Sequence, residues 1–468
     1  MRARAKAVVL RLYRWLNDRI GLDDVLGPTV RHPVPPDVNW WYVFGSAALI
    51  AFVIQVVTGV ALAFTYVPAP NAAYESIRFI TEEAVGGRLV RGIHWFGASA
   101  MVILVVAHLV QVYLHGSYKF PRELNWLVGV VLLLLTLGMA FTGQILRWNQ
   151  DAYWGTVVAA SQAGRTPLIG DLLVQVLLAG QTVGGATLTR FYATHVFLIP
   201  ALLFGLIGLH LLLVLRHGIA EPPRAGHPVD PRTYEREYQD LLHRKGIPFW
   251  PEAAWKDVLF ALLVGAVVVA LAVFVGPPAV GEQADPTNLS TYPRPDWYFL
   301  WLFALLALMP PQVEDLVILG LPLLAGLALF ALPLLAPYGE RSPRRRPWAV
   351  AAVVLPALGI AVLLREGYAA PWSPRLPPPA LPVEVTQPLS GSALQGARLF
   401  QDKGCIACHA VAGTGGRRGP DLSRVGGRLS NDQLTWRILN GATNMPAYGD
   451  TLQPDETASL VAFLGSRR

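Results

Sequence analysis

Residues 91–114 read RGIHWFGASAMVILVVAHLVQVYL, an almost uninterrupted apolar run that contains two histidines, His94 and His108. A second apolar run contains His195 and His210. Separations of 14 and 15 residues return each pair to nearly the same face of a helix, about 21 Å apart along its axis. Two such helices facing each other would present two histidine pairs at two levels.

Two facing imidazoles, one on each side of a flat macrocycle, are the ligands of a bis-histidine haem. The four histidines therefore predict two b-type haems at two depths of a membrane. A single histidine on an apolar face is more often a buried structural residue. Four in register, at a depth where a polar ring is costly, favour haem ligation.

The composition indicates a membrane protein. The chain has 468 residues, of which 53% are hydrophobic and 15% are charged, and its mean hydropathy is +0.42. These values are typical of proteins that cross a membrane several times. Seven stretches are long enough, or nearly so, to cross about 30 Å of hydrocarbon as helices. They are residues 40–66, 94–114, 126–146, 191–215, 258–275, 316–335 and 348–364.

Lys and Arg are divided unevenly between the loops. When the loops are assigned alternately, the side of the N-terminus collects 20 of these residues and the opposite side collects 7. The positive-inside rule therefore predicts a cytoplasmic N-terminus and places the region after the seventh span outside. Anionic membrane lipid beside the cytoplasmic loops accounts for the net charge of +7, without a nucleic-acid partner. Residues 1–15 predict an amphipathic surface helix and no signal peptide.

The last part of the chain differs in character. Seven prolines between residues 371 and 388 predict a semi-rigid, extended spacer. Beyond it, Cys405-Ile-Ala-Cys408-His409 has the Cys-x-x-Cys-His pattern of covalent c-type haem attachment, with His409 as an iron ligand. Met445, the only methionine of this region, is the candidate for the second iron ligand. A disulfide or a zinc site is the alternative for the cysteines, and a core side chain is the alternative for Met445.

Several segments resemble cytochrome b of the quinol:cytochrome c oxidoreductases. They are Arg91-Gly-Ile-His94-Trp, Pro121-Arg-Glu-Leu, Thr189-Arg190-Phe-Tyr-Ala-Thr-His195 and Pro295-Asp-Trp-Tyr298. The match covers nearly all of residues 1–368, and the tail resembles a class I cytochrome c. The resemblance implies an all-α fold, in which a seven-helix transmembrane bundle (a four-helix dihaem core plus three helices) precedes a small α-helical cytochrome c domain.

The same resemblance implies four parts of the chain. They are an N-terminal dihaem domain (1–218), a three-helix domain with the quinol-site loop (219–368), a Pro-rich linker (369–390) and the cytochrome c domain (391–468).

The resemblance also assigns the histidines to individual haems. His94 and His195 are expected to hold a low-potential haem b near the outer face, and His108 and His210 a high-potential haem b near the cytoplasmic face. Further haem contacts are implied for Gly45, Gly59, Gly129, Gly143, Arg91 and Arg190. Glycines let the backbone approach a macrocycle, and arginines pair with propionates. Ordinary helix packing and interfacial anchoring are the alternatives.

The motif Pro295-Asp296-Trp297-Tyr298 matches the family's outer quinol-oxidation site. The family usually has glutamate where this chain has Asp296, and the resemblance implies that this carboxylate accepts a quinol proton, with Tyr298 in the same site. A helix cap is the alternative for Asp296. Gln144 is a second departure, since related bacterial proteins often carry tyrosine there. These departures leave the type of quinone open.

On the cytoplasmic side, His217, Lys256 and Asp257 resemble the quinone-reduction site of the respiratory branch, where a histidine and an aspartate deliver protons to quinone. Charged loop residues beside a span are the alternative. The 15-residue ligand spacing and the three spans after the fourth instead resemble the split plastid-type bf proteins. However, Val43 stands where those proteins carry the cysteine that attaches an extra haem.

Together these features predict a quinol–cytochrome-c reductase that sends the two electrons of quinol along separate routes in a proton-translocating Q cycle. The chain has only two cysteines, both in the c-type motif, so the iron-sulfur cluster is expected in a separate Rieske subunit. The expected cofactors are two haem b, one covalent haem c and quinone. The expected partners are the Rieske subunit, membrane lipid, a downstream cytochrome c or terminal oxidase and a second copy of the chain, in the bacterial inner (plasma) membrane.

Two other classes of function fit part of the pattern. In a seven-helix transporter or receptor with an added c domain, the four histidines would bind substrate or relay protons. In a dihaem electron conduit without bifurcation, the chain would anchor a dehydrogenase. Two b haems for each c haem would argue against the first class, and oxidant-induced reduction of the b haems would argue against the second.

Overall fold

The computed structural model describes residues 2–180, 183–285, 288, 294–369, 380–416, 419–441, 445, 447–449 and 451–468. Within these ranges the chain is mostly helical. Its strands form two small antiparallel pairs, β1 (Pro33–Val34) with β2 (Ile247–Pro248) and β3 (Ala410–Val411) with β4 (Thr414–Gly415). The predicted all-α fold class is confirmed.

Seven helical segments of this described part are long and apolar enough to cross a membrane. They are η1 (Trp40–Val43) with α3 (Phe44–Ala63), α5 (Gly87–Leu114), α6 (Glu123–Ile145), the segment from α9 to α10 (Gly185–His217), α12 (Trp255–Phe274), α14 (Pro311–Leu335) and α15 (Pro347–Ala369). The seven predicted spans are confirmed, and several of the helices extend beyond the predicted ends. Because α5 begins at Gly87 and not at His94, this histidine lies about two turns inside the helix.

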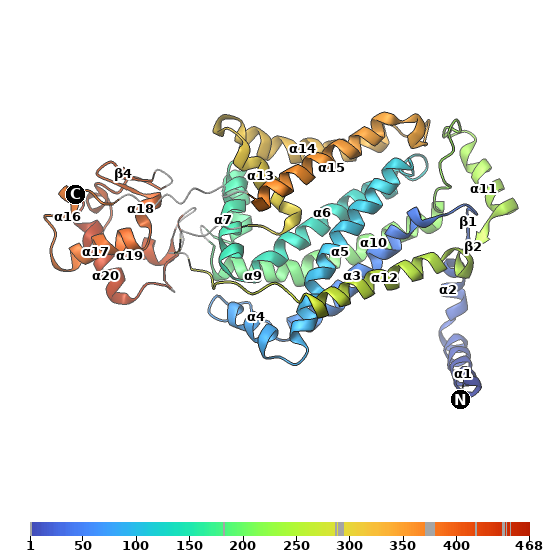
Figure 1. The fold of residues 1–468 in the computed structure, drawn as a ribbon, viewed down its shortest axis with the longest axis horizontal. Helices are drawn as coiled ribbons and strands as arrows, with labels where there is room; N and C mark the ends of the chain where they lie inside the picture. The colour runs from blue at the N-terminus through green and yellow to red at the C-terminus, as the bar shows by residue number, and fades with distance from the viewer. Residues whose placement is uncertain are drawn as a thin grey trace.

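Four of these spans surround one interior (Figure 1). α3 packs along α5, α6 packs along α10, and α5 also contacts α6. The hydrophobic cluster between them takes Ala47 and Ala51 from α3, Met101 from α5 and Leu203 from α10. Small side chains let helices approach closely in lipid, where packing drives association.

The fourth span is not a regular α-helix. α9 (Gly185–Ala193) passes into η2 (Thr194–Leu198), a π-helical turn, before α10 (Ile199–His217) completes the span. Pro200, in the first turn of α10, has no N–H to donate to the preceding turn, which favours a break in the α-helical pattern. His195 lies within η2, and π-helical turns occur often at functional sites.

Helices also form between the spans, where the sequence analysis described only loops. They are α4 (Ala73–Glu82), α7 (Gln150–Gly164), α8 (Gly170–Leu178) and α13 (Trp297–Leu308). α7 packs against α8, and α13 packs against α15. α13 begins directly after Asp296, so the predicted quinol-site motif lies at the start of a helix and not in an extended loop.

The N-terminal helices are α1 (Arg2–Ile20) and α2 (Leu22–Arg31). The later loops contain α11 (Tyr234–Lys245), η3 (Phe249–Ala253) and η4 (Pro343–Arg345). The N-terminal helices and α11 lie at the end of the bundle opposite α7 (Figure 1). α1 covers the residues for which an N-terminal helix was predicted.

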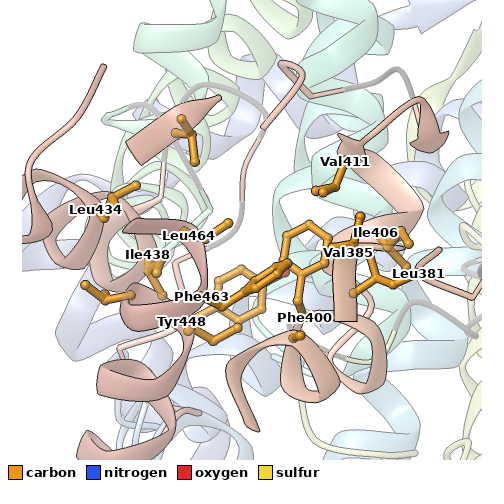
Figure 2. Packing of buried hydrophobic residues seen from close by; sticks show 14 of the residues in the cluster. Leu381, Val385, Phe400, Ile406, Val411, Leu434, Ile438, Tyr448, Phe463 and Leu464 are labelled. Carbon is orange, nitrogen blue, oxygen red and sulfur yellow. The ribbon is translucent and has the colours of Figure 1, made fainter. Parts of the chain in front are cut away.

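The C-terminal region has a hydrophobic core of its own (Figure 2). Its helices are α16 (Val383–Thr386), α17 (Gly391–Asp402), α18 (Cys405–Cys408), η5 (Val425–Gly427), α19 (Asn431–Asn440) and α20 (Pro454–Gly465). α17 packs on α20, with the rings of Phe400 and Phe463 5.5 Å apart. Gly396 permits this close approach, because a Cβ there would collide with the backbone oxygen of Ser459.

The predicted boundaries between domains stay predictions. Most of the predicted proline-rich spacer lies outside the described residues, which include none of positions 370–379.

Buried cations connect three loops at the end of the bundle nearest His108 and His210. Arg341, which is 3% exposed, forms an ion pair with Glu221 and donates to the backbone oxygen of His115 at 3.3 Å. Lys119 donates to the backbone oxygen of Ala336 at 2.8 Å. These contacts join the loops that follow α5, α10 and α14.

Replacing Arg341 with methionine is expected to lower the free energy of unfolding by about 2 kcal/mol, because the carboxylate of Glu221 loses its partner. The effect is smaller than for a fully buried pair, since Glu221 is 26% exposed. Arg224→Met is the control, because the ion pair of Arg224 with Asp37 lies in solvent and contributes about 0.5 kcal/mol. Thermal unfolding in detergent, followed by circular dichroism, measures both variants. Equal decreases of the unfolding temperature in the two variants would contradict the role given to Arg341.

Candidate haem and quinone sites

The first histidine pair joins α5 to η2. The ring centres of His94 and His195 are 6.4 Å apart. The Nδ1 atoms of these rings contact the hydroxyl groups of Thr58 and Thr142, at 2.9 and 3.1 Å. These contacts fix the orientation of both rings and leave each Nε2 available to a metal.

The second pair joins α5 to α10. The ring centres of His108 and His210 are 6.3 Å apart. The Nδ1 atoms of both rings are buried and make no hydrogen bond within the described part of the chain. The same helices therefore carry two histidine pairs at two levels.

The spacing of both pairs suits a metal with two imidazole ligands. Two metal–nitrogen bonds of about 2 Å each, with the distance from each nitrogen to its ring centre, place the ring centres about 6 Å apart. The separations of 6.4 and 6.3 Å agree with this arrangement. The residues present therefore fit two haems of the b type, and the ligand role of each histidine stays a prediction.

Each of the four predicted glycines faces one histidine ring. A Cβ would lie near the Cε1 atom of that ring, at 3.2 Å for Gly45 with His108, 3.2 Å for Gly59 with His94, 2.7 Å for Gly143 with His195 and 3.7 Å for Gly129 with His210. Glycine thus brings the backbone of α3 and α6 up to the rings. At Gly143 a side chain has the least room.

The two predicted arginines lie in different surroundings. Arg91 is buried one turn before His94 on α5 and donates to the hydroxyl of Thr81 at 3.0 Å. Arg190 is exposed, and its guanidinium donates to the backbone oxygens of Gln175 and Val176 in α8. Contact of either arginine with a propionate stays a prediction.

Asp296 and Tyr298 lie together at the start of α13. The hydroxyl of Tyr298 donates to Oδ2 of Asp296 at 2.9 Å, and Nη2 of Arg147 lies 3.4 Å from Oδ1. Asp296 occupies the N-cap position, but its side chain makes no capping hydrogen bond. The alternative that Asp296 serves as a cap is therefore not supported.

A cavity of about 320 Å³ lies between α6, α7 and α13. Gln144, Pro295 and Phe299 are among the residues that line it. Gln144 follows Gly143, so the cavity adjoins the part of α6 that flanks the first histidine pair. Most of the lining is aliphatic or aromatic, which suits a flat apolar ring. Asp296 lies at its edge, directly after Pro295.

The three residues predicted for an inner quinone site lie near the second histidine pair. Asp257 accepts a hydrogen bond from the hydroxyl of Ser46, which follows the glycine that faces His108. Lys256 donates to the backbone oxygen of Val38 at 2.8 Å. His217 ends α10 and is half-buried. The side chain of Asp257 is thus hydrogen-bonded to α3, whereas the ammonium group of Lys256 is hydrogen-bonded to the backbone before η1.

The c-type motif lies at the edge of the C-terminal core. Cys405 and Cys408 are one turn apart in α18, and His409 follows them directly. The Nδ1 atom of His409 contacts the backbone oxygen of Pro420 at 2.8 Å, so Nε2 is available to a metal. Burial lowers the pKa of His409 and raises the pKa of Cys405 to about 12. Met445 packs against the core that also contacts Cys405, so these residues fit a covalent haem.

The sequence analysis missed three residues of these sites. Thr58 and Thr142 each precede a glycine that faces the first pair, and the repeated Thr-Gly dipeptide is a signal that could have revealed them. Arg147 is the third residue. No local pattern joins it to Asp296.

Gly143→Ala is expected to lower the b-haem content from the predicted two per chain toward one, because the new Cβ lies 2.7 Å from the ring of His195. Gly205→Ala on α10 is the matched control, since a Cβ there meets no heavy atom within 4 Å. Pyridine haemochrome spectra measure b haem relative to covalent c haem. An unchanged ratio in Gly143→Ala would show that the ring and the glycine do not share a haem site.

Three family descriptions match consecutive parts of the chain. "Cytochrome b/b6/petB" matches residues 29–218, and "Cytochrome b(C-terminal)/b6/petD" matches residues 283–376. "Cytochrome C oxidase, cbb3-type, subunit III" matches residues 391–464. The order of these matches agrees with a cytochrome b followed by a cytochrome c domain.

Individual proteins show the same likeness. Cytochrome b of Rhodobacter capsulatus is 36% identical over 298 residues, which are 63% of this chain and 66% of that protein. Cytochrome b6 of Crocosphaera subtropica is 38% identical over 212 residues, which are 45% of this chain and 96% of that protein. A solved structure titled "Hyperthermophilic respiratory Complex III" matches with a TM-score of 0.64 and 27% identity, covering 76% of this chain and 91% of that chain. The chain therefore belongs to the cytochrome b/b6 family, binds haem b in a membrane-integral domain, and carries a cytochrome c domain for covalent haem.

Proposed function

We propose that this chain is the cytochrome b–c fusion subunit of a quinol:cytochrome c oxidoreductase. The observation that carries the proposal is the cavity of about 320 Å³ next to the first histidine pair. Quinol oxidation requires an apolar space for the ring, a proton acceptor and an electron acceptor. This largely apolar cavity has the carboxylate of Asp296 at its edge and a histidine pair that fits a haem beside it. The likeness to a respiratory Complex III structure supports the proposal.

A quinol loses two protons as well as two electrons when it becomes quinone. Asp296 accepts one of these protons, because its carboxylate follows the cavity-lining Pro295 and is oriented by Tyr298. When bound, the two b haems supply a route across the membrane for one electron. A separate Rieske iron-sulfur subunit would supply the route for the other electron toward the c haem. Each quinol thus gives one electron to each route.

At the inner site, His217 and Asp257 deliver protons to quinone as it is reduced, and Lys256 directly precedes Asp257 in the sequence. The position of Asp257 next to α3 and the second histidine pair supports this role. Release of protons at one face and uptake at the other completes a Q cycle.

The proposed location is the bacterial inner membrane, and the distribution of Lys and Arg supports an N-terminus in the cytoplasm and a c domain outside. The proposed partners are the Rieske subunit, membrane lipid, a downstream cytochrome c or terminal oxidase, and a second copy of this chain.

Purified with its native subunits, the complex is expected to contain two b haems for each c haem and to show extra b-haem reduction when oxidant is added with quinol. Asp296→Asn is expected to slow this reduction by about 100-fold, because general base catalysis contributes at least that factor. Asp315→Asn is the control, since this carboxylate is 66% exposed and pairs with Arg165. Stopped-flow spectra at the b-haem bands measure all three proteins.

A complex that lacks oxidant-induced reduction would be a simple electron conduit. Equal rates for Asp296→Asn and the control would remove the carboxylate from the mechanism.

Cutting the chain within residues 371–379 is expected to leave b-haem reduction by quinol intact and to slow c-haem reduction. A tether keeps the c domain at a millimolar effective concentration, so separation at micromolar protein costs about 1000-fold in rate. A protease site placed in the spacer allows the cut and uncut forms of one preparation to be compared. Equal rates of c-haem reduction in the cut and uncut forms would show that the tether does not govern how fast the c domain meets the Rieske subunit.

A further inference from the structure

The cavity between α6, α7 and α13 has few polar side chains in its lining. They are Gln144, Thr156 and Gln162. The hydroxyl of Thr156 donates to the backbone oxygen of Ala152 at 2.8 Å, so it is engaged within α7. Gln162 is half-buried near the end of that helix. Gln144 is only 6% exposed, which makes it the buried amide of this lining.

The amide of Gln144 has a defined direction. The backbone N–H of Asp296 donates to Oε1 of Gln144 in a long hydrogen bond of 3.5 Å. The reverse orientation of the amide would set two donors against each other. The NH2 group lies on the other side, near Gly155, where an added Cβ would be 3.7 Å from Nε2. Gly155 also lines the cavity, so the donor end of Gln144 faces it.

Arg147 contacts both residues of this hydrogen bond, Gln144 and Asp296. Its Nε donates to the backbone oxygen of Gln144 at 3.3 Å, and its Nη2 lies 3.4 Å from the carboxylate of Asp296. The arginine therefore holds the start of α13 against the end of α6. This keeps the backbone N–H of Asp296 directed at Gln144.

The ligand that fits such a cavity is flat, mostly apolar and carries an oxygen that can accept a hydrogen bond. Phe141 and Phe299 both line the cavity, with ring centres 6.3 Å apart, and provide aromatic surface. One buried donor in an apolar lining fixes how a ligand is oriented, because leaving that donor unpaired is costly.

We propose that Gln144 donates a hydrogen bond from Nε2 to an oxygen of the quinone ring in this cavity, and that Arg147 is the residue that positions it. This assignment rests on the proposed function and adds to it the group that recognises the substrate. The structure gives Asp296 a different task, since its carboxylate faces Arg147 and Tyr298.

Two substitutions of Gln144 separate binding from structure. Gln144→Glu keeps an oxygen for the N–H of Asp296 but removes the NH2 donor at pH 8, whereas Gln144→Leu removes both. With the complete complex and decylubiquinol, both variants are expected to raise KM by about threefold to tenfold, the range for one hydrogen bond, with a smaller change in kcat. The competitive inhibition constant of decylubiquinone, which can only accept hydrogen bonds, should rise by the same factor.

Arg147→Gln is expected to raise KM by about twofold to threefold, and Arg147→Lys to restore part of the loss. Arg78→Gln is the control, because Arg78 pairs with Glu75 on the exposed face of α4. The b-haem spectrum of each variant shows whether the bundle is assembled.

A wild-type KM and inhibition constant in Gln144→Glu would overturn the assignment, even if Gln144→Leu is impaired, because only the amide oxygen would then matter. If Gln144→Leu does not assemble, Gln144→Glu decides alone. Failure of the proposed function is a separate outcome, in which the wild-type complex does not oxidise quinol at all.

Discussion

The spacing of two histidine pairs is the constraint on which the rest of the membrane domain depends. Both ring separations, 6.4 and 6.3 Å, agree with a metal held between two imidazoles. To keep this spacing at two levels, α5 and the fourth span, which comprises α9, η2 and α10, must stay at a fixed distance over most of their length. Glycines on α3 and α6 make room beside the rings, and the alanines of α3 let that helix lie close to its neighbours.

The two ends of this frame are built for different tasks. Near the second pair, buried cations bind backbone oxygens and one carboxylate across three loops, which makes this end rigid. Near the first pair, short helices enclose an apolar cavity, and a single arginine links the end of α6 to the start of α13.

The spans and the four histidines could be predicted because apolar length and helical period are local properties of the sequence. α13 was not predicted: with 12 residues it is too short to cross a membrane and looks like part of a loop. The contact of Arg147 with Asp296 depends on how distant segments fold together, so no local pattern reveals it. The haem contact of Arg190 stays a prediction, and its guanidinium lies on carbonyl groups of α8.

The π-helical turn of the fourth span explains why the two histidines of that span are one residue further apart in sequence than those of α5. His94 and His108 are 14 residues apart, and His195 and His210 are 15 apart, yet the two ring separations differ by only 0.1 Å. A π turn bonds residue i to i+5 where an α turn bonds i to i+4, so η2 absorbs the surplus residue. Deleting one residue from η2 would therefore remove the surplus residue and keep His195 and His210 in register. The same deletion between His94 and His108 would turn one imidazole about 100° away from the ring that it faces.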